Sequence, residues 1–165
     1  MTAPKYTARE ASGLWVFLEQ QDGVLEPVSI ELLVKARQLA DQSHQAVTAV
    51  VTGYEIGHLA APATAFGADE VLLAEHRLLR HYTTAPYTKV VTQIIQDRKP
   101  DILLLGATAN GRDLAGRLAV RLRTGLTADC TDLSLDEDGL LVGQVPGFGR
   151  GILAGILCPQ HRPQM

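Results

Sequence analysis

One segment of the chain carries the residues best suited to hold a ligand. Residues 106–113 read GATANGRD and lie between a run of leucines and a predicted helix. Glycine lets backbone N–H groups approach an anion closely, and the N-terminus of a helix adds a partial positive charge. Hydroxyl and amide side chains can donate hydrogen bonds to a phosphate, and an arginine can pair with it. The candidate cofactor-binding residues, for a nucleotide or another anion, are Gly106, Thr108, Asn110, Gly111 and Arg112.

The same segment also has a purely structural interpretation. The spacing of Gly106 and Gly111 is similar to that of a phosphate-binding loop. However, Arg112 stands where such a loop has lysine, and Asp113 stands where it has serine or threonine. Asp113 would also repel a triphosphate, so a Walker-type NTPase is disfavoured. The alternative is that Gly111 and Gly116 permit close packing of a helix on a sheet, and both interpretations stay open.

A row of arginines follows on the predicted helix, at positions 112, 117, 121 and 123. Asp113 and Arg117 have the i,i+4 spacing of a helical ion pair. The row can be a solvated helix face, or it can be an interface with an acidic partner.

No other residues form a credible catalytic or metal-binding group. The five histidines show no i,i+4 pairing and lie near no Cys-x-x-Cys pair, so we expect no metal ligands. Cys130 and Cys158 fall in apolar or strand-like runs, where packing is their expected role. The chain has no Gly-x-Ser-x-Gly elbow and no paired-carboxylate motif. We therefore expect no catalytic residue and a protein that is not an enzyme.

The elements that must position residues 106–113 alternate between strands and helices. Continuous apolar runs predict buried strands at 14–18, 46–52, 70–74 and 102–105. Apolar residues at helical spacing predict helices at 29–42, 55–66, 84–99 and 112–123, with Thr84 as a cap of the third. This order is typical of an α/β fold with a doubly wound, mainly parallel sheet and helices on both faces.

The alternation of predicted strands and helices ends after Gly125. Runs at 129–135, 140–145 and 152–157 predict three further strands, the first two joined by a tight turn at 136–139 and the last preceded by a glycine-rich loop over 146–151. Because short turns join antiparallel neighbours, we expect an antiparallel addition in this C-terminal part, at the edge of the sheet.

Length and composition set bounds on the function. The chain has 165 residues, 46% of them hydrophobic and 20% charged, which predicts one globular domain. Its net charge of −3 disfavours a nucleic-acid-binding protein. No apolar run is long enough to span a membrane, and the N-terminal residues do not form a signal peptide. We expect a cytoplasmic protein, and two cysteines are too few for a disulfide framework.

Several stretches of the chain together resemble one protein family. Residues 106–122 (GATANGRDLAGRLAVRL) are followed by 124–133 (TGLTADCTDL), and residues 158–165 read CPQHRPQM. WVFLE at 15–19 also matches, as does the order of strands and helices. With these motifs the chain resembles the alpha subunit of electron transfer flavoprotein, the FixB family, from about residue 14 to residue 165.

The resemblance implies a part in electron transfer. Members of this family are heterodimers that take electrons from dehydrogenases such as acyl-CoA dehydrogenases, as in fatty acid beta-oxidation, or that serve nitrogen fixation in the FixB relatives. Their alpha subunit has an N-terminal domain with an adenine-nucleotide α-hydrolase-like fold and a C-terminal domain that carries most of the FAD site, whereas the AMP site belongs to the beta subunit.

For this chain the resemblance implies an N-terminal domain over 1–157 and, over 158–165, the start of a linker to a C-terminal FAD-binding domain that the sequence lacks. The expected partner is the electron transfer flavoprotein beta subunit, with dehydrogenases reached through the complex. FAD is expected in the complete family protein but not in this chain alone, and the isolated domain could form a homodimer.

A second hypothesis comes from the glycine-containing turn. A stand-alone adenine-nucleotide-binding module resembling the universal stress proteins would place a phosphate there. An enzyme of the α-hydrolase superfamily is disfavoured, because the Ser-Gly-Gly-x-Asp loop of its pyrophosphatases is missing.

Overall fold

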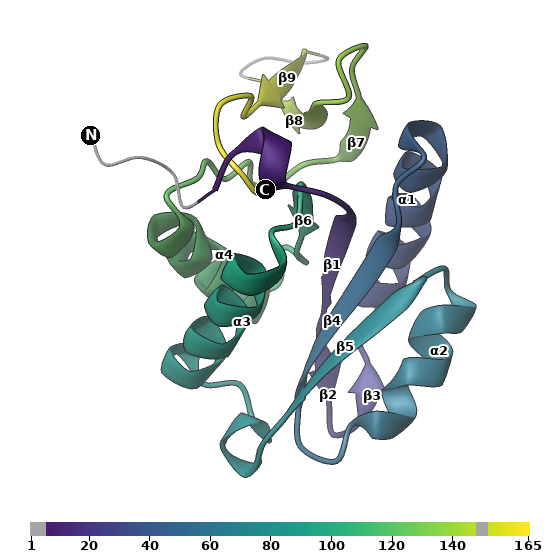
Figure 1. Ribbon diagram of the computed structural model, residues 1–165, viewed down its shortest axis with the longest axis vertical. Coiled ribbons are helices and arrows are strands. Elements are labelled where there is room, and N and C mark those ends of the chain that lie inside the picture. Colours follow the sequence, from purple (N-terminus) through teal and green to yellow (C-terminus); the bar gives the residue numbers. More distant parts are fainter. Residues whose placement is uncertain (1–5, 148–151) are drawn as a thin grey trace.

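A four-stranded parallel sheet forms the centre of the molecule (Figure 1). The computed structural model describes residues 6–147 and 152–165. The strand order is β5-β4-β1-β6, and every neighbouring pair runs parallel. The strands are β1 (Leu14–Leu18), β4 (Val47–Gly53), β5 (Glu70–Glu75) and β6 (Ile102–Leu104). The predicted mainly parallel sheet is confirmed, and each strand lies within one residue of its predicted range.

Helices cover both faces of this sheet, which confirms the doubly wound architecture (Figure 1). One face carries α1 (Pro27–Ser43) and α2 (Ala60–Ala65), and the other carries α3 (Thr84–Arg98) and α4 (Ala109–Leu122). Three short 3-10 helices are also present: η1 (Ala8–Glu10), η2 (Gly57–Leu59) and η3 (Arg77–Leu79). The helix predicted over 55–66 is therefore divided into η2 and α2.

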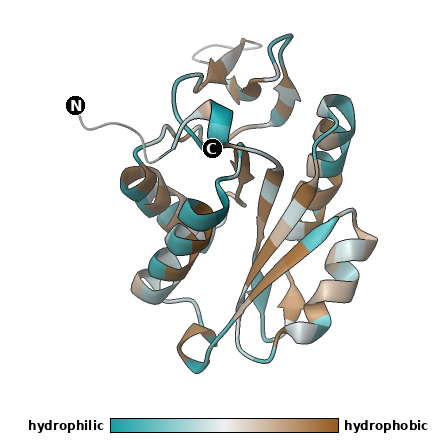
Figure 2. Ribbon diagram, viewed as in Figure 1, coloured by the Kyte–Doolittle hydropathy of each residue, from teal (hydrophilic) through white to brown (hydrophobic). Residues whose placement is uncertain are grey.

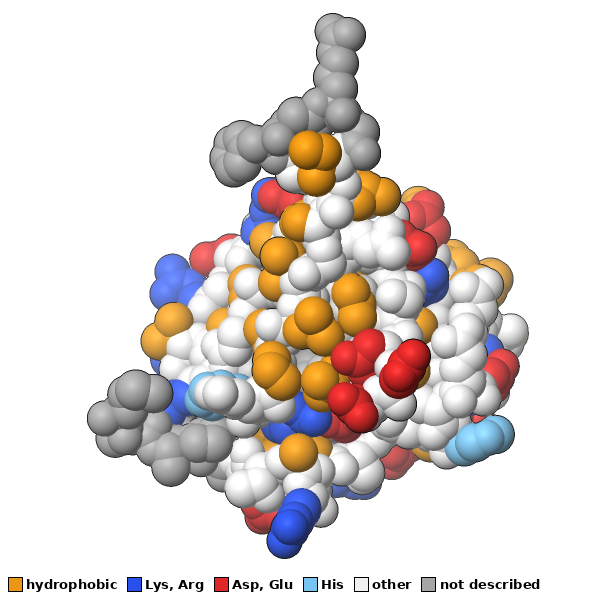
Figure 3. All heavy atoms as spheres, turned by 90° about the horizontal axis from the view of Figure 1, so that it is seen from above, with side chains coloured by type: hydrophobic (Ala, Val, Ile, Leu, Met, Phe, Trp, Pro, Cys, Tyr) orange, Lys and Arg blue, Asp and Glu red, His pale blue; other side chains and the backbone are white. Residues whose placement is uncertain are grey.

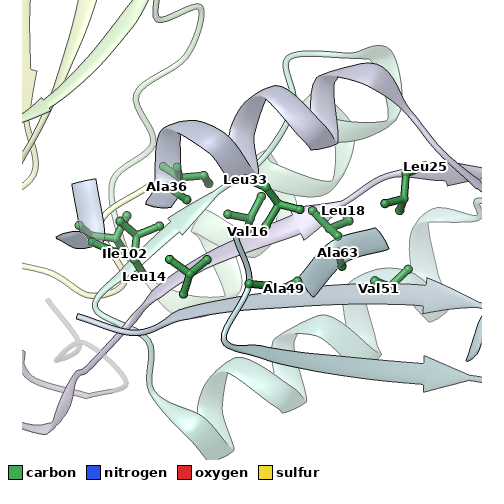
Figure 4. Close-up of a cluster of buried hydrophobic side chains, with 14 of the residues drawn as sticks. Leu14, Val16, Leu18, Leu25, Leu33, Ala36, Ala49, Val51, Ala63 and Ile102 are labelled. Carbon is green, nitrogen blue, oxygen red and sulfur yellow. The ribbon is translucent and has the colours of Figure 1, made fainter. Parts of the chain in front are cut away.

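Alternate residues of the central strands fill two separate cores. From β1, the side chains of Leu14, Val16 and Leu18 pack with α1 and α2 (Figure 4). Trp15 and Phe17 point to the opposite face and pack with α3 and α4. Because β1 is buried on both faces, its sequence is a continuous apolar run (Figure 2).

Two helices begin at positions that differ from the predicted ones. α4 begins at Ala109, three residues earlier than predicted, because Thr108 caps it. The N-cap of α3 is Thr83, not the predicted Thr84. The Thr84 hydroxyl instead donates to a carboxylate oxygen of Asp113, at 2.7 Å.

The C-terminal part contains the predicted antiparallel strands. They are β7 (Asp132–Leu135), β8 (Leu141–Pro146) and β9 (Leu153–Leu157), in the order β7-β8-β9. Their ladder is confirmed as antiparallel, and the strands pair with one another in a sheet of their own. A small hairpin of β2 (Gln20–Gln21) and β3 (Val24–Leu25) follows β1. Residues 148–151 of the predicted glycine-rich loop lie outside the described residues.

Residues 162–165 pack into the domain. The Arg162 guanidinium forms an ion pair with the carboxylate of Asp101, and both side chains are largely buried. Gln164 pairs in parallel with Ile102 at the open edge of β6. Four residues of the stretch predicted as a linker thus belong to the fold, while the domain boundary itself stays a prediction. In the described ranges, no helix has the length and apolar character needed to cross a membrane.

The two-sided core makes a direct test of the packing possible. The side chain of Leu118 in α4 is fully buried, whereas Leu78 in η3 is 71% exposed. We expect Leu118→Ala to lower the free energy of unfolding by about 2–5 kcal/mol, through lost burial and the cavity left behind. The same change at Leu78 should alter it by no more than about 0.5 kcal/mol. Urea unfolding of both variants measures the difference, and similar losses at the two positions would contradict this account of the core.

Candidate functional site

The candidate site lies where the direction of strand order reverses. The chain passes from β1 to β4 and β5 on one side, whereas β6 pairs with the other side of β1. In open α/β sheets, ligands bind outside the carboxyl ends of the strands at this point. Glu19 follows β1 there, and Gly106 follows β6. The predicted segment 106–113 therefore stands at the position where this architecture holds ligands.

Thr108 organises the turn. Its hydroxyl oxygen accepts a hydrogen bond from the Gly111 amide at 2.9 Å, and its carbonyl accepts one from the Arg112 amide at 2.9 Å. These bonds satisfy two amides at the start of α4. The Thr108 hydroxyl in turn donates its hydrogen to Oε2 of Glu19 at 2.6 Å. One side chain therefore joins the start of α4 to the residue that follows β1.

The carboxylate of Glu19 occupies the space inside the turn. A Cβ added to Gly106 would lie 2.6 Å from Glu19 Oε1, and one added to Gly111 would lie 2.9 Å from the same atom. At Gly111 it would also lie 2.0 Å from the carbonyl oxygen of Gly106. Gly106 and Gly111 are thus required by the close approach of a carboxylate and of the backbone. The predicted packing role is supported for Gly111 but not for Gly116, because a Cβ added to Gly116 would meet no atom within 4 Å. Ionised, Glu19 would repel an anion placed in the turn.

A second connection holds Glu19 from its backbone. The Glu19 amide donates to the Ser29 hydroxyl at 2.7 Å, and that hydroxyl donates to the Glu19 carbonyl at 3.0 Å. Ser29 is fully buried in the first turn of α1. Neither Glu19 nor Ser29 is among the site residues predicted from the sequence. Two features of the sequence could have identified them. Glu19 is a charged residue directly after a buried strand, and Ser29 is a serine inside the apolar face of a helix.

Burial shapes the electrostatics of this carboxylate. Desolvation raises the pKa of Glu19 above its ordinary value, and the hydrogen bond from Thr108 opposes the rise. Oε1 is buried, with no hydrogen-bond partner in the part of the chain that the structure describes. A buried oxygen in this state favours the protonated form of the carboxyl group.

The remaining predicted residues lie on the outer side of the turn. Asn110 is exposed. The Arg112 guanidinium is also exposed and is joined to both carboxylate oxygens of Asp129, at 2.6 and 3.2 Å. Of the five candidates, Gly106, Thr108 and Gly111 converge on Glu19, and Asn110 and Arg112 do not.

Asp113 has a structural environment of its own. Its carboxylate accepts hydrogen bonds from the hydroxyls of Thr84 and Tyr82, both at 2.7 Å, and from Nε of Arg117 at 3.1 Å. These donors lower the pKa of Asp113 to about 2. Asp113 thus ties α4 to the start of α3. Arg112 and Arg117 of the predicted arginine row form ion pairs within the chain.

A groove with a volume of about 500 Å³ lies beside the turn. Its lining is mostly apolar and comes from α1, β6, the start of α4, residues 126–130, β7 and β8. Lys35 and Asp132, 2.6 Å apart, are among the few charged residues that line it. Cys130 also lines the groove, and burial raises the pKa of its thiol. Such a thiol is a poor nucleophile at neutral pH.

Within residues 6–147 and 152–165, no three His, Cys, Asp or Glu side chains are grouped so that they could hold a metal ion. The arrangement at the turn binds the protein's own carboxylate, and the groove offers apolar surface.

Comparison with known proteins gives a consistent group of relatives. A sequence model described as "Electron transfer flavoprotein domain" matches residues 14–165. The chain is 47% identical over 152 residues to "Electron transfer flavoprotein subunit alpha" of Thermoanaerobacterium thermosaccharolyticum, covering 92% of this chain and 46% of that protein. It is 48% identical over 156 residues to "Protein FixB" of Rhizobium meliloti, covering 92% and 44%. The chain thus spans slightly less than half the length of these curated relatives.

Two further comparisons are with another sequence relative and with a solved structure. "Acryloyl-CoA reductase electron transfer subunit beta" of Anaerotignum propionicum is 37% identical over 175 residues, covering 92% of this chain and 48% of that protein. Among solved structures, a universal stress protein in complex with cAMP aligns with a TM-score of 0.46 and 18% identity, over 74% of this chain and all of that one.

The buried carboxylate predicts a pH dependence of stability. Folding raises the pKa of Glu19 above 4.5. At pH values between the pKa of the unfolded chain and that of the folded protein, the folded protein therefore binds more protons than the unfolded chain. The contribution of Glu19 to the free energy of unfolding therefore falls as pH rises from its ordinary pKa through the raised one. Glu19→Gln cannot titrate, so we expect wild type to lose stability relative to this variant over that range.

Urea unfolding at a series of pH values measures this difference. Glu31→Gln, at an exposed position of α1, is the matched control and should follow wild type throughout. A free energy of unfolding of wild type that stays constant or increases with pH, relative to that of Glu19→Gln, would contradict the assignment.

Proposed function

The chain belongs to the electron transfer flavoprotein family, and on this premise we propose that it is the N-terminal domain of an electron transfer flavoprotein alpha subunit. The observation that carries the proposal is 47% identity to such a subunit over 92% of the chain. In this function the domain is part of a cytoplasmic, heterodimeric electron carrier that contains FAD. The carrier takes electrons from dehydrogenases such as acyl-CoA dehydrogenases.

The turn at residues 106–113 does not fit the pyrophosphate of FAD. The turn that would receive a pyrophosphate is filled by Glu19, and its outer arginine is paired with Asp129. A pyrophosphate in the turn would meet the repulsion of this carboxylate. The flavin of the complete protein would therefore be held by other residues, and this domain contributes structure and contact surface to the carrier.

An exposed apolar strand supports a docking role. β9 ends the antiparallel sheet, and hydrophobic side chains gather over this end of the molecule (Figure 3). The exposed fractions are 57% for Ile152, 61% for Leu153 and 40% for Ile156. An edge strand with exposed apolar side chains is a typical site of protein association. We propose that it docks the beta subunit.

A domain exchange tests this function. In the alpha subunit of Clostridium acetobutylicum, 47% identical over 154 residues, the aligned region would be replaced by residues 14–165 and co-expressed with that organism's beta subunit. We expect a heterodimer that contains flavin, measured by light scattering and by absorbance. A chimera that stays monomeric, while the unchanged alpha subunit assembles, would refute the proposal.

The docking surface is tested in the same chimera. Leu153→Asp places a charge in the apolar patch and should weaken assembly with the beta subunit by about tenfold or more, because the charge must be desolvated on docking. Leu78→Asp, on the exposed η3, is the control and should leave assembly unchanged. Equal affinities for the two variants would move the docking surface away from β9.

The second candidate is an adenine-nucleotide module, and one observation favours it. The glycine turn, capped by Thr108, stands at the ligand position of the fold. An anion there has to displace Glu19, so Glu19→Ala should bind AMP or inorganic phosphate more tightly than wild type. Calorimetry of wild type, Glu19→Ala and the control Glu31→Ala measures this. Lack of binding to Glu19→Ala at about 1 mM ligand would reject the candidate.

A further inference from the structure

Asn110 is the single asparagine of the sequence, and a glycine follows it. It lies exposed in the first turn of α4. Its side-chain amide forms no hydrogen bond with any residue that the structure describes. The Cγ carbon of this amide is therefore open to attack by a neighbouring group and to water.

An asparagine that precedes glycine can react with its own backbone. The glycine nitrogen forms a bond to Cγ of the asparagine, the bond from Cγ to the side-chain nitrogen breaks, and ammonia leaves with the hydrogen of the glycine amide. Water then opens the cyclic imide at either carbonyl carbon, which gives aspartate or isoaspartate. Glycine permits the ring to close because no side chain shields its nitrogen. The reaction consumes only water.

The folded turn restrains the attacking nitrogen. The Gly111 amide donates to the Thr108 hydroxyl at 2.9 Å, and the Arg112 amide donates to the Thr108 carbonyl at 2.9 Å. Asn110 has a helical backbone. Ring closure requires rotation about the Cα–C bond of Asn110 out of the helical range, and this rotation carries the Gly111 amide away from Thr108. The reaction therefore needs an opened turn.

The strength of the cap determines how often this turn opens. The Thr108 hydroxyl that accepts from Gly111 is itself fixed, because it donates to Oε2 of Glu19 at 2.6 Å. The first turn of a helix is among the parts that open most easily, and each lost bond raises the population of the open form. The rate of the reaction at Asn110 follows this population.

We propose that Asn110 is a site of spontaneous deamidation, and that the hydrogen bonds of Thr108 limit its rate by keeping the first turn of α4 closed. The reaction takes place within the chain and is independent of the proposed function.

The isoaspartate product does not fit the closed turn. It lengthens the backbone between residue 110 and Gly111 by one carbon atom. Gly111 is buried, and even a Cβ added to it would lie 2.0 Å from the Gly106 carbonyl oxygen and 2.9 Å from Glu19 Oε1. The longer backbone therefore displaces Gly111 from Thr108. Aspartate keeps the backbone length, and its charge is favourable at the N-terminus of a helix.

Incubation of the folded chain at mildly alkaline pH measures the reaction. Trypsin cleavage after Arg98 and Arg112 releases residues 99–112, in which mass spectrometry detects the replacement of the side-chain NH2 group by OH. Thr108→Val removes the hydroxyl and keeps the shape of the side chain. We expect deamidation to become about fivefold faster or more, as for a lost helix cap. Thr108→Ser keeps the hydroxyl and should retain the wild-type rate.

Thr83→Val is the matched control, because Thr83 is the N-cap of α3 and its side chain forms no cap hydrogen bond. It should leave the rate at Asn110 unchanged. Circular dichroism verifies that the variants are folded, and the chain unfolded in urea gives the upper limit of the rate. Folded wild type that forms no product while the unfolded chain is fully converted overturns the site. Equal rates in folded wild type and folded Thr108→Val, or in folded and unfolded wild type, overturn the control by Thr108.

The two products are then compared. Asn110→Asp carries aspartate alone, and we expect it to unfold at a temperature no lower than that of wild type. The isoaspartate fraction of the incubated protein, separated by ion exchange, should unfold at a lower temperature and exchange the Gly111 amide hydrogen faster. An isoaspartate fraction that matches Asn110→Asp in both measurements would overturn the inferred opening of the turn.

Discussion

The hydrogen bond between Thr108 and Glu19 holds together the part of the fold where a ligand would be expected. It joins the end of β1 to the start of α4, and the Ser29 hydroxyl adds the start of α1 to the same carboxylate residue. The close approach of the carboxylate explains why residues 106 and 111 are glycine. Two helices are therefore joined to the central strands through one residue, α4 through the carboxylate of Glu19 and α1 through its backbone.

The point where the strand order reverses is occupied by side chains of the protein itself, and this limits where a functional surface can lie. Doubly wound sheets usually bind nucleotides or cofactors at this position. Here the polar groups of the turn bind one another, and the exposed arginine at the turn is neutralised by Asp129. Among the described residues, two surfaces are instead mostly apolar: β9 at the end of the antiparallel sheet and the groove beside β6. A domain of this kind is suited to assembly.

The sequence was sufficient for the architecture, because the architecture depends on local patterns. The strands β1 and β4 are buried along their whole length, and a continuous apolar run reports such burial directly. The antiparallel strands could be predicted because a short turn in the sequence joins antiparallel neighbours. The interior of the candidate site could not be predicted in this way, since it joins residues far apart in the chain: Glu19 meets Thr108, and Asp113 meets Tyr82 and Thr84. The predicted cap at Thr84 failed for the same reason, because a distant carboxylate binds its hydroxyl.

The packing of residues 162–165 has a mechanical consequence. A proline-containing stretch with polar residues is usually flexible, and rotation of one domain against another is then distributed along it. Arg162 and Gln164 are instead held by Asp101, Leu103 and Leu141. Rotation is therefore not distributed along residues 162–165, which are fixed at the open edge of the sheet beside Ile102.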